Sequence, residues 1–334
     1  MPGQLMVSIE GTALDAATRK RLSHPQIGGV ILFARNFVSP DQLSDLTAEI
    51  RALRSPSLLV AVDQEGGPVQ RFKDGFTRLP AMGMIGERYD IDPTAALALA
   101  RATGIVLANE LRECGIDFSF APVVDLGFDN RAIGARAFHR EPKVVQELAL
   151  QLAGGMALSG MRAVAKHFPG HGGATEDPHD ELPWDERSLD SLREHDLGVY
   201  EHLETGAFTG VMTCHVLFPK IDTVPATLSR KLIIDELRGR IGFTGPVFSD
   251  DLMMGALGAY GEASSLVRSA REAGCDMVLL CNNDAVTDSV LERDDFPSLN
   301  EDAALRLERM RPAQAALPDT LTVEQAREEI RKYP

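Results

Sequence analysis

Residues 161–179 read MRAVAKHFPGHGGATEDPH, an apolar run followed by a stretch rich in histidine, glycine and proline. The run Met161–Ala165 is typical of a short buried strand. The fourteen residues from Lys166 to His179 hold three histidines, two acidic residues, two prolines and three glycines. Such a composition breaks any helical repeat. The sequence therefore predicts a strand that ends in a polar loop, which is where active sites lie in α/β proteins.

Apolar runs of similar length recur along the chain, and most of them are followed by a helical pattern. Eight runs predict strands: Gln4–Ser8, Gly29–Phe33, Leu58–Val62, Phe118–Val124, Met161–Ala165, Gly210–Thr213, Pro246–Phe248 and Met277–Leu280. Amphipathic patterns predict helices over Pro40–Leu53, Pro93–Cys114, Pro142–Leu158, Ser188–Leu203, Ser229–Arg238 and Glu262–Ala273. Gly104 weakens the prediction for the helix in which it lies.

Strands that alternate with helices form a parallel sheet with right-handed crossovers. Eight such units close a barrel. The sequence thus predicts an α/β fold of the (β/α)8 TIM-barrel type, with residues 1–334 as a single catalytic domain and a helical tail from about residue 299.

A doubly wound open sheet is the alternative architecture. It would bind ligands at a switch point beside a glycine-rich phosphate turn. No GxGxxG or GxxxxGK(S/T) pattern follows an early strand here, and Gly170–Gly173 has neither the spacing nor a Lys or Ser/Thr for a phosphate group. The barrel is therefore the favoured architecture.

The charge balance limits the classes of partner. The 334 residues carry a formal net charge of −15, which disfavours nonspecific binding to nucleic acid or to an anionic membrane. A small-molecule substrate is the expectation. The N-terminus has no signal-peptide pattern and no segment has the apolar length of a membrane span, so a cytoplasmic location is expected.

The four cysteines are expected to be buried thiols. They have apolar neighbours and no CxxC spacing, which favours core packing over a disulfide or a zinc site. These residues are Cys114, Cys214, Cys275 and Cys281.

Polar residues follow the predicted strands. The groups are Asp63-Gln64-Glu65-Gly66-Gly67, Asp125, His215, Ser249-Asp250-Asp251 and Asn282-Asn283-Asp284. In a barrel these strand ends meet on one face. Their convergence makes a functional site more plausible than any one of them could.

Asp177 and His179 are candidates for proton transfer. An aspartate two positions before a histidine can turn back onto the imidazole and raise its basicity. The same pattern also occurs in a solvated, charge-rich loop that has no catalytic role. The three histidines His167, His171 and His179, with Asp177, could instead bind a metal. Their spacing matches no HExxH pattern and no cysteine lies nearby, so no metal or other cofactor is expected.

Two further stretches carry polar groups with alternative roles. Asp250 and Asp251 point to opposite sides of a strand, so at most one of them faces the barrel mouth, and either could instead cap the next helix. The segment Asp63–Arg71 is rich in paired donors and acceptors, which suit a neutral polyhydroxylated ligand. Arg136 would be judged a surface cation if considered alone.

Six motifs together resemble the single-domain β-N-acetylhexosaminidases of glycoside hydrolase family 3. They appear in the family's order between about Gly28 and Asn283. The motifs are DQEGGPVQR at residues 63–71, IGARAF at 133–138, KHFPGHG with Asp177-Pro178-His179 at 166–179, VMTCH at 211–215, FSDDLM at 248–253 and AGCDMVLLCNN at 273–283.

The resemblance implies a (β/α)8 barrel that performs retaining hydrolysis of a terminal β-linked N-acetylglucosamine, from peptidoglycan fragments in the cytoplasm and without metal or cofactor. It implies that Asp250 is the nucleophile and that His179 is the acid/base, paired with Asp177. It also implies a set of sugar-binding residues: Asp63, Arg71, Arg136, Lys166 and His167. Retaining glycosidases usually use two carboxylates, whereas here a histidine would replace the second.

One residue departs from the family pattern, which reads Asp-Ser-His where this chain has Asp177-Pro178-His179. Proline stiffens the loop and removes a backbone donor. A β-glucosidase or a glycoside phosphorylase on the same barrel remains an alternative activity. A catalytically silent sugar-binding barrel is the alternative from another class, and the intact Asp250, Asp177 and His179 oppose it.

Overall fold

Eight parallel strands close into a barrel in the structure, a computed structural model that describes residues 3–128, 130–174, 178, 181–201, 207–293, 301–318 and 321–333. Around the barrel the strands follow the order β1-β10-β9-β8-β7-β6-β3-β2. They are β1 (Leu5–Ser8), β2 (Ile27–Leu32), β3 (Leu59–Val62), β6 (Phe118–Ser119), β7 (Arg162–Phe168), β8 (Phe208–Thr213), β9 (Val247–Asp251) and β10 (Met277–Leu280). The predicted (β/α)8 barrel is confirmed.

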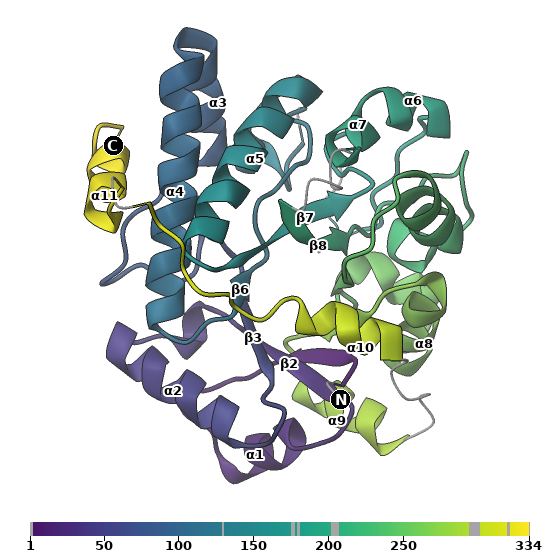
Figure 1. The fold of residues 1–334 in the computed structure, drawn as a ribbon. Helices are drawn as coiled ribbons and strands as arrows, with labels where there is room; N and C mark the ends of the chain where they lie inside the picture. Colours follow the sequence, from purple (N-terminus) through teal and green to yellow (C-terminus); the bar gives the residue numbers. More distant parts are fainter. Residues whose placement is uncertain are drawn as a thin grey trace.

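Helices surround this barrel, as Figure 1 shows. The α-helices are α1 (Ala16–Leu22), α2 (Pro40–Ala52), α3 (Met82–Ile91), α4 (Pro93–Glu113), α5 (Pro142–Leu158), α6 (Leu189–Glu194), α7 (Asp196–Tyr200), α8 (Ala263–Ala273), α9 (Asp284–Glu292), α10 (Glu301–Glu308) and α11 (Val323–Arg331). Shorter or differently wound helices are η1 (Ala34–Asn36), η2 (Gly134–Arg136), η4 (Ala226–Leu228), η5 (Lys231–Arg240) and η6 (Gly255–Tyr260). Across the described residues, no helix combines the length and the apolar composition that crossing a membrane requires.

The barrel strands are buried on both faces, so their sequences are nearly continuous apolar runs. Three aromatic rings from β6, the segment after it and β9 pack together inside the barrel. Phe118, Phe120 and Phe248 have ring centroids 5.2 to 5.6 Å apart. All four cysteines are buried and unpaired, as predicted.

The strands β6 and β7 differ in length from their predictions. The run Phe118–Val124 pairs regularly only over Phe118–Ser119, and Val123 then forms an isolated bridge with Lys166. Pro122 lies between Ser119 and Val123 and has no backbone N–H group to donate to a neighbouring strand. In contrast, β7 continues past Ala165 to Phe168, so Lys166 and His167 lie on the strand and not in the loop.

Gly104 does not interrupt α4, because its missing side chain lets α5 approach. A Cβ atom on Gly104 would lie 2.0 Å from the carbonyl oxygen of Leu152, and one on Gly155 would lie 2.1 Å from that of Arg101. Each helix thus places a glycine against the backbone of the other helix at their contact. Tertiary packing here outweighs the low helix propensity of glycine.

The predicted helix over Ser188–Leu203 is divided in the structure. It forms α6 and α7, with His195 between them outside helical geometry at φ −122° and ψ −86°.

The C-terminal helices brace the end of the barrel opposite the polar strand ends. On α10, Arg306 donates to Asp276 at 2.6 Å, and Asp276 precedes β10. The chain then crosses the barrel and α11 packs beside α4 (Figure 1). There Arg327 pairs at 3.0 Å with Glu110, whose carboxylate also accepts from Thr77 at 2.6 Å.

Candidate active site

A cavity of about 500 Å³ opens where the strands end. Its walls come from residues far apart in the chain, including Asp63, Lys166, Met212, Asp250 and Leu279. This volume is within the range of small-molecule sites. The predicted convergence of polar strand ends is confirmed by these positions on the barrel.

Glu65 is the hub of an ion-pair network in this cavity. The Lys166 ammonium donates to Glu65 at 2.6 Å and to Asp63 at 2.7 Å. The Arg136 guanidinium donates to both oxygens of the Glu65 carboxylate, at 2.8 and 2.9 Å. Arg136 is therefore part of the cavity wall and not an isolated surface cation.

These partners keep the buried groups charged. Burial alone would raise the pKa of Glu65, but the charges of Lys166 and Arg136 hold it well below its usual value. Burial alone would lower the pKa of Lys166, but Asp63 and Glu65 raise it overall. The cavity thus holds fixed donors and acceptors across the neutral pH range.

A small hairpin carries Arg71 to the cavity edge. Its strands are β4 (Gln64–Gly66) and β5 (Val69–Gln70). The side-chain oxygen of Gln64 accepts the backbone N–H groups of Arg71 at 2.8 Å and Phe72 at 3.0 Å. The Arg71 guanidinium then lies 3.8 Å from Asp63 and is one-third exposed, so it faces the cavity with donors to spare.

Asp125 orients His167. The imidazole Nδ1 lies 2.6 Å from one carboxylate oxygen of Asp125, and the other oxygen accepts the backbone N–H of His171 at 2.7 Å. Burial would raise the pKa of Asp125, but His167 lowers it overall. An ionised Asp125 accepts a hydrogen bond from the Nδ1–H group of His167, which fixes the orientation of the imidazole ring in the cavity wall.

His171 also lines the cavity and is almost fully buried. It is 3% exposed, and burial lowers its pKa. Asn130 donates to its carbonyl oxygen at 2.9 Å. Since burial favours the uncharged ring, His171 supports the wall as a neutral group.

Asp250 and Asp251 have different surroundings at the end of β9. One carboxylate oxygen of Asp250 accepts the N–H of Asp251 at 2.8 Å. The Asp251 carboxylate instead accepts the N–H groups of Met253 and Cys281, each at 3.0 Å. Asp251 therefore ties together the segments after β9 and β10, and Asp250 keeps an oxygen for chemistry.

Asp250 is ionised in this setting. Burial would raise its pKa, but His215, His167 and Lys166 lower it overall. His215 is held by Thr227 at Nδ1 and by the Asp251 carbonyl at Nε2, both at 2.9 Å. An ionised carboxylate on the wall of a sugar-sized cavity is suited to nucleophilic attack.

Asp177 and His179 lie outside the described residues. Pro178, between them, is buried and lines the same cavity as Asp250. Its carbonyl oxygen accepts the N–H of Ala256 at 3.1 Å. Among the described residues no group of three His, Cys, Asp or Glu side chains is arranged to bind a metal ion, and a metal set that includes Asp177 and His179 is not tested.

Sequence reasoning noted Glu65, Asp125 and His215 as polar strand-end residues but assigned them no role. The alternation of an extended chain places Asp63 and Glu65 on one side, which is the signal that could have paired them. No local sequence pattern indicates a role for Asn130 in the site.

Comparisons with known proteins agree with this geometry. The family model described as "Glycosyl hydrolase family 3 N terminal domain" matches residues 3–306. A relative named Beta-hexosaminidase from Alkalilimnicola ehrlichii is 50% identical over 309 residues, which cover 92% of this chain and 88% of the relative.

Solved structures are similar over almost the full length. The crystal structure of native NagZ from Neisseria gonorrhoeae is 43% identical with a TM-score of 0.92, covering 99% of this chain and 97% of that chain. The same protein in complex with N-trifluoroacetyl-D-glucosamine gives the same values of 43% and 0.92, with 99% and 97% covered.

Proposed function

Because the chain belongs to glycosyl hydrolase family 3 and is a glycoside hydrolase of the β-N-acetylhexosaminidase type, we propose that it removes terminal β-linked N-acetylglucosamine from peptidoglycan fragments. In such fragments this sugar is joined through a β-1,4 bond to N-acetylmuramic acid. The proposal places the reaction in cell-wall recycling in the cytoplasm, and it takes residues 1–334 as one catalytic domain with a helical tail.

One observation carries the proposal. An ionised Asp250 shares a cavity of about 500 Å³ with charged groups that are already oriented by their partners. Asp63, Arg71, Arg136, Lys166 and His167 would hold the sugar hydroxyls and the N-acetyl group. Preorganised donors and acceptors of this kind cost little reorganisation when substrate binds.

In the first proposed step, Asp250 attacks the anomeric carbon and forms a covalent glycosyl ester. The bond to the leaving oxygen breaks, and His179 gives that oxygen a proton. In the second step water attacks the same carbon, His179 takes a proton from it, and Asp250 leaves as a carboxylate. The net configuration is retained.

Asp177 would position His179 and stabilise its charged form, as a carboxylate does for a catalytic imidazole. Pro178 lines the cavity that also contains Asp250, which supports a role in the reaction for the two residues that flank it in the sequence.

Activity on an aryl N-acetyl-β-glucosaminide tests this function. Release of the phenol, with the matched aryl glucoside hydrolysed far more slowly, supports the proposal. A faster reaction on the glucoside would favour the β-glucosidase alternative. A sugar phosphate formed in phosphate buffer would indicate a phosphorylase. No turnover of any of these by folded protein would indicate the sugar-binding alternative.

A further inference from the structure

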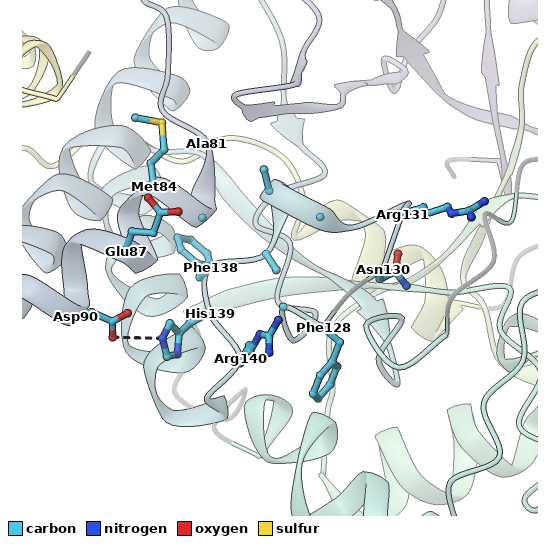
Figure 2. Close-up of a pocket in the computed structure, with 15 residues that line it drawn as sticks. Ala81, Met84, Glu87, Asp90, Phe128, Asn130, Arg131, Phe138, His139 and Arg140 are labelled. Atoms are coloured by element: carbon cyan, nitrogen blue, oxygen red, sulfur yellow. Dashed lines mark ion pairs between the residues drawn. The ribbon is translucent and has the colours of Figure 1, made fainter.

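A second hollow lies next to the catalytic cavity. This groove has a volume of about 700 Å³, and Figure 2 shows the residues that line it. One side is the face of α3 that carries Met84, Glu87 and Asp90. The other side comes from the segment between β6 and α5, which contributes Phe128, Arg131 and Arg140, among others.

The groove and the catalytic cavity meet around η2. Arg131, Gly134 and Ala135 line both hollows. Gly134 has open space where a side chain would be, so no side chain of this residue separates them. A ligand whose N-acetylglucosamine ring fills the cavity can therefore extend into the groove.

Charges in the groove are arranged unevenly. Asp90, on α3, lies 3.4 Å from His139, and Figure 2 shows Arg131 at the opposite end. In the cavity, Lys166 and Arg136 form ion pairs with carboxylates. Among the described residues, Arg131 makes no ion pair or hydrogen bond, although it is exposed at the junction of the two hollows.

We propose that the groove is the aglycone subsite and that Arg131 binds a carboxylate carried by the aglycone beside the scissile oxygen. The inference rests on the proposed function and refines its substrate class. In N-acetylmuramic acid the lactyl ether occupies the ring carbon next to the one that bears the scissile oxygen. Its free carboxylate therefore lies one substituent away from the reacting bond, and Arg131 lines the junction of the cavity and the groove.

The chemistry of arginine suits this role. A guanidinium offers paired donors that match a carboxylate, and a charged hydrogen bond is stronger than a neutral one. Glu87, at the far end of the groove, disfavours a second anion there. The preferred fragments would have a free lactyl acid, so the reaction that supplies them is the hydrolysis of the amide between the lactyl group and a peptide.

The test compares two disaccharides with each variant. Both have N-acetylglucosamine β-1,4-linked to N-acetylmuramic acid, one with the free lactyl carboxylate and one with its N-methylamide. The measured quantity is the ratio of kcat/KM on the acid to kcat/KM on the amide. Wild type should prefer the acid, and Arg131→Gln should lower the ratio by roughly tenfold.

Two controls separate charge from folding. Arg131→Lys keeps the charge but loses the paired donors, so its ratio should lie between those of wild type and Arg131→Gln. Arg101→Gln removes an exposed arginine on α4 outside both hollows, and it should leave the ratio unchanged. Raising the salt concentration should lower the wild-type ratio toward that of Arg131→Gln, since exposed charge interactions are screened.

The possible outcomes separate the proposed function from the aglycone subsite. No cleavage of either disaccharide by wild type would overturn the proposed function. Cleavage of both with the same ratio in wild type and Arg131→Gln would overturn only the aglycone subsite. A fall in the ratio that Arg131→Lys reproduces would also overturn it, because the effect would then be one of shape.

Discussion

The Nδ1 atom of His167 lies 2.6 Å from Oδ2 of Asp125, and the other oxygen of that carboxylate accepts the N–H of His171. One buried aspartate therefore sets the orientation of a cavity imidazole and fixes the start of the loop after β7.

Asp125→Asn should lower kcat/KM by about ten- to a hundredfold, because a charged hydrogen bond to His167 is lost and the amide keeps the volume. Asp117→Asn is the matched control. Asp117 is also buried, but it pairs with Arg51 at the start of β6. That variant should lose stability while its folded fraction keeps normal kcat/KM. Equal effects of both substitutions on kcat/KM would contradict a role of Asp125 in orienting His167.

Asp250→Asn should lower kcat by at least about a thousandfold, because the proposed covalent step needs the carboxylate. Asp251→Asn should act mainly on stability, since Asp251 accepts N–H groups from Met253 and Cys281. Steady-state kinetics and chemical denaturation of both variants separate these effects. If the Asp251 variant were dead and the Asp250 variant nearly normal, the nucleophile would be misassigned.

His179→Ala should cost more on a natural disaccharide than on an activated aryl glycoside. A nitrophenolate leaves with little help, whereas a sugar alkoxide needs a proton, and general acid catalysis contributes about a hundredfold or more. Comparing kcat/KM for the two substrates measures the bias, and Asp177→Ala should show it more weakly. Equal losses on both substrates would make His179 a binding group.

The Glu65 network should make stability depend on acid pH. The folded pKa of Glu65 lies below its usual value of 4.5, so its stabilisation is present above about pH 4.5 and fades as the pH falls further. The free energy of unfolding of wild type should therefore exceed that of Glu65→Gln by about 3 kcal/mol near neutral pH. The difference should shrink in denaturation series below pH 4.5. Glu272→Gln, on the surface, is the control, and a constant difference for Glu65→Gln would contradict the ion-pair account.

Activity should survive exhaustive treatment with a chelator. The described residues offer no metal-binding group of three side chains, and the proposed steps need no metal. The measurement is turnover before and after chelation, with the metal content of the sample checked. Loss of activity that zinc restores would revive a metal site at His167, His171 and His179.

The barrel was predictable because each strand is buried on both faces and so leaves a continuous apolar run. Strand ends were less predictable. The polar pair Lys166 and His167 belongs to β7 because Lys166 finds carboxylates at Asp63 and Glu65, which lie more than a hundred positions away in the chain. No local pattern carries that information.

The site was predictable at the level of motifs but not at the level of roles. Side-chain alternation predicted that at most one of Asp250 and Asp251 faces the barrel mouth, but both line the cavity. What distinguishes them is that the Asp251 carboxylate accepts N–H groups from residues as distant as Cys281. Gly104 similarly looked like a helix breaker, and only the approach of Leu152 explains it. Partners supplied by other segments of the chain decide each of these cases.

The enclosure of Lys166 between Asp63 and Glu65 has a consequence for covalent probes of this enzyme. An amine reacts with aldehydes or activated esters only as the neutral base, and these two carboxylates raise the pKa of Lys166. Amine-directed warheads placed in the cavity will therefore leave Lys166 unlabelled at neutral pH. Electrophiles that alkylate carboxylates, such as epoxides carried on an N-acetylglucosamine frame, have the ionised Asp250 as their target.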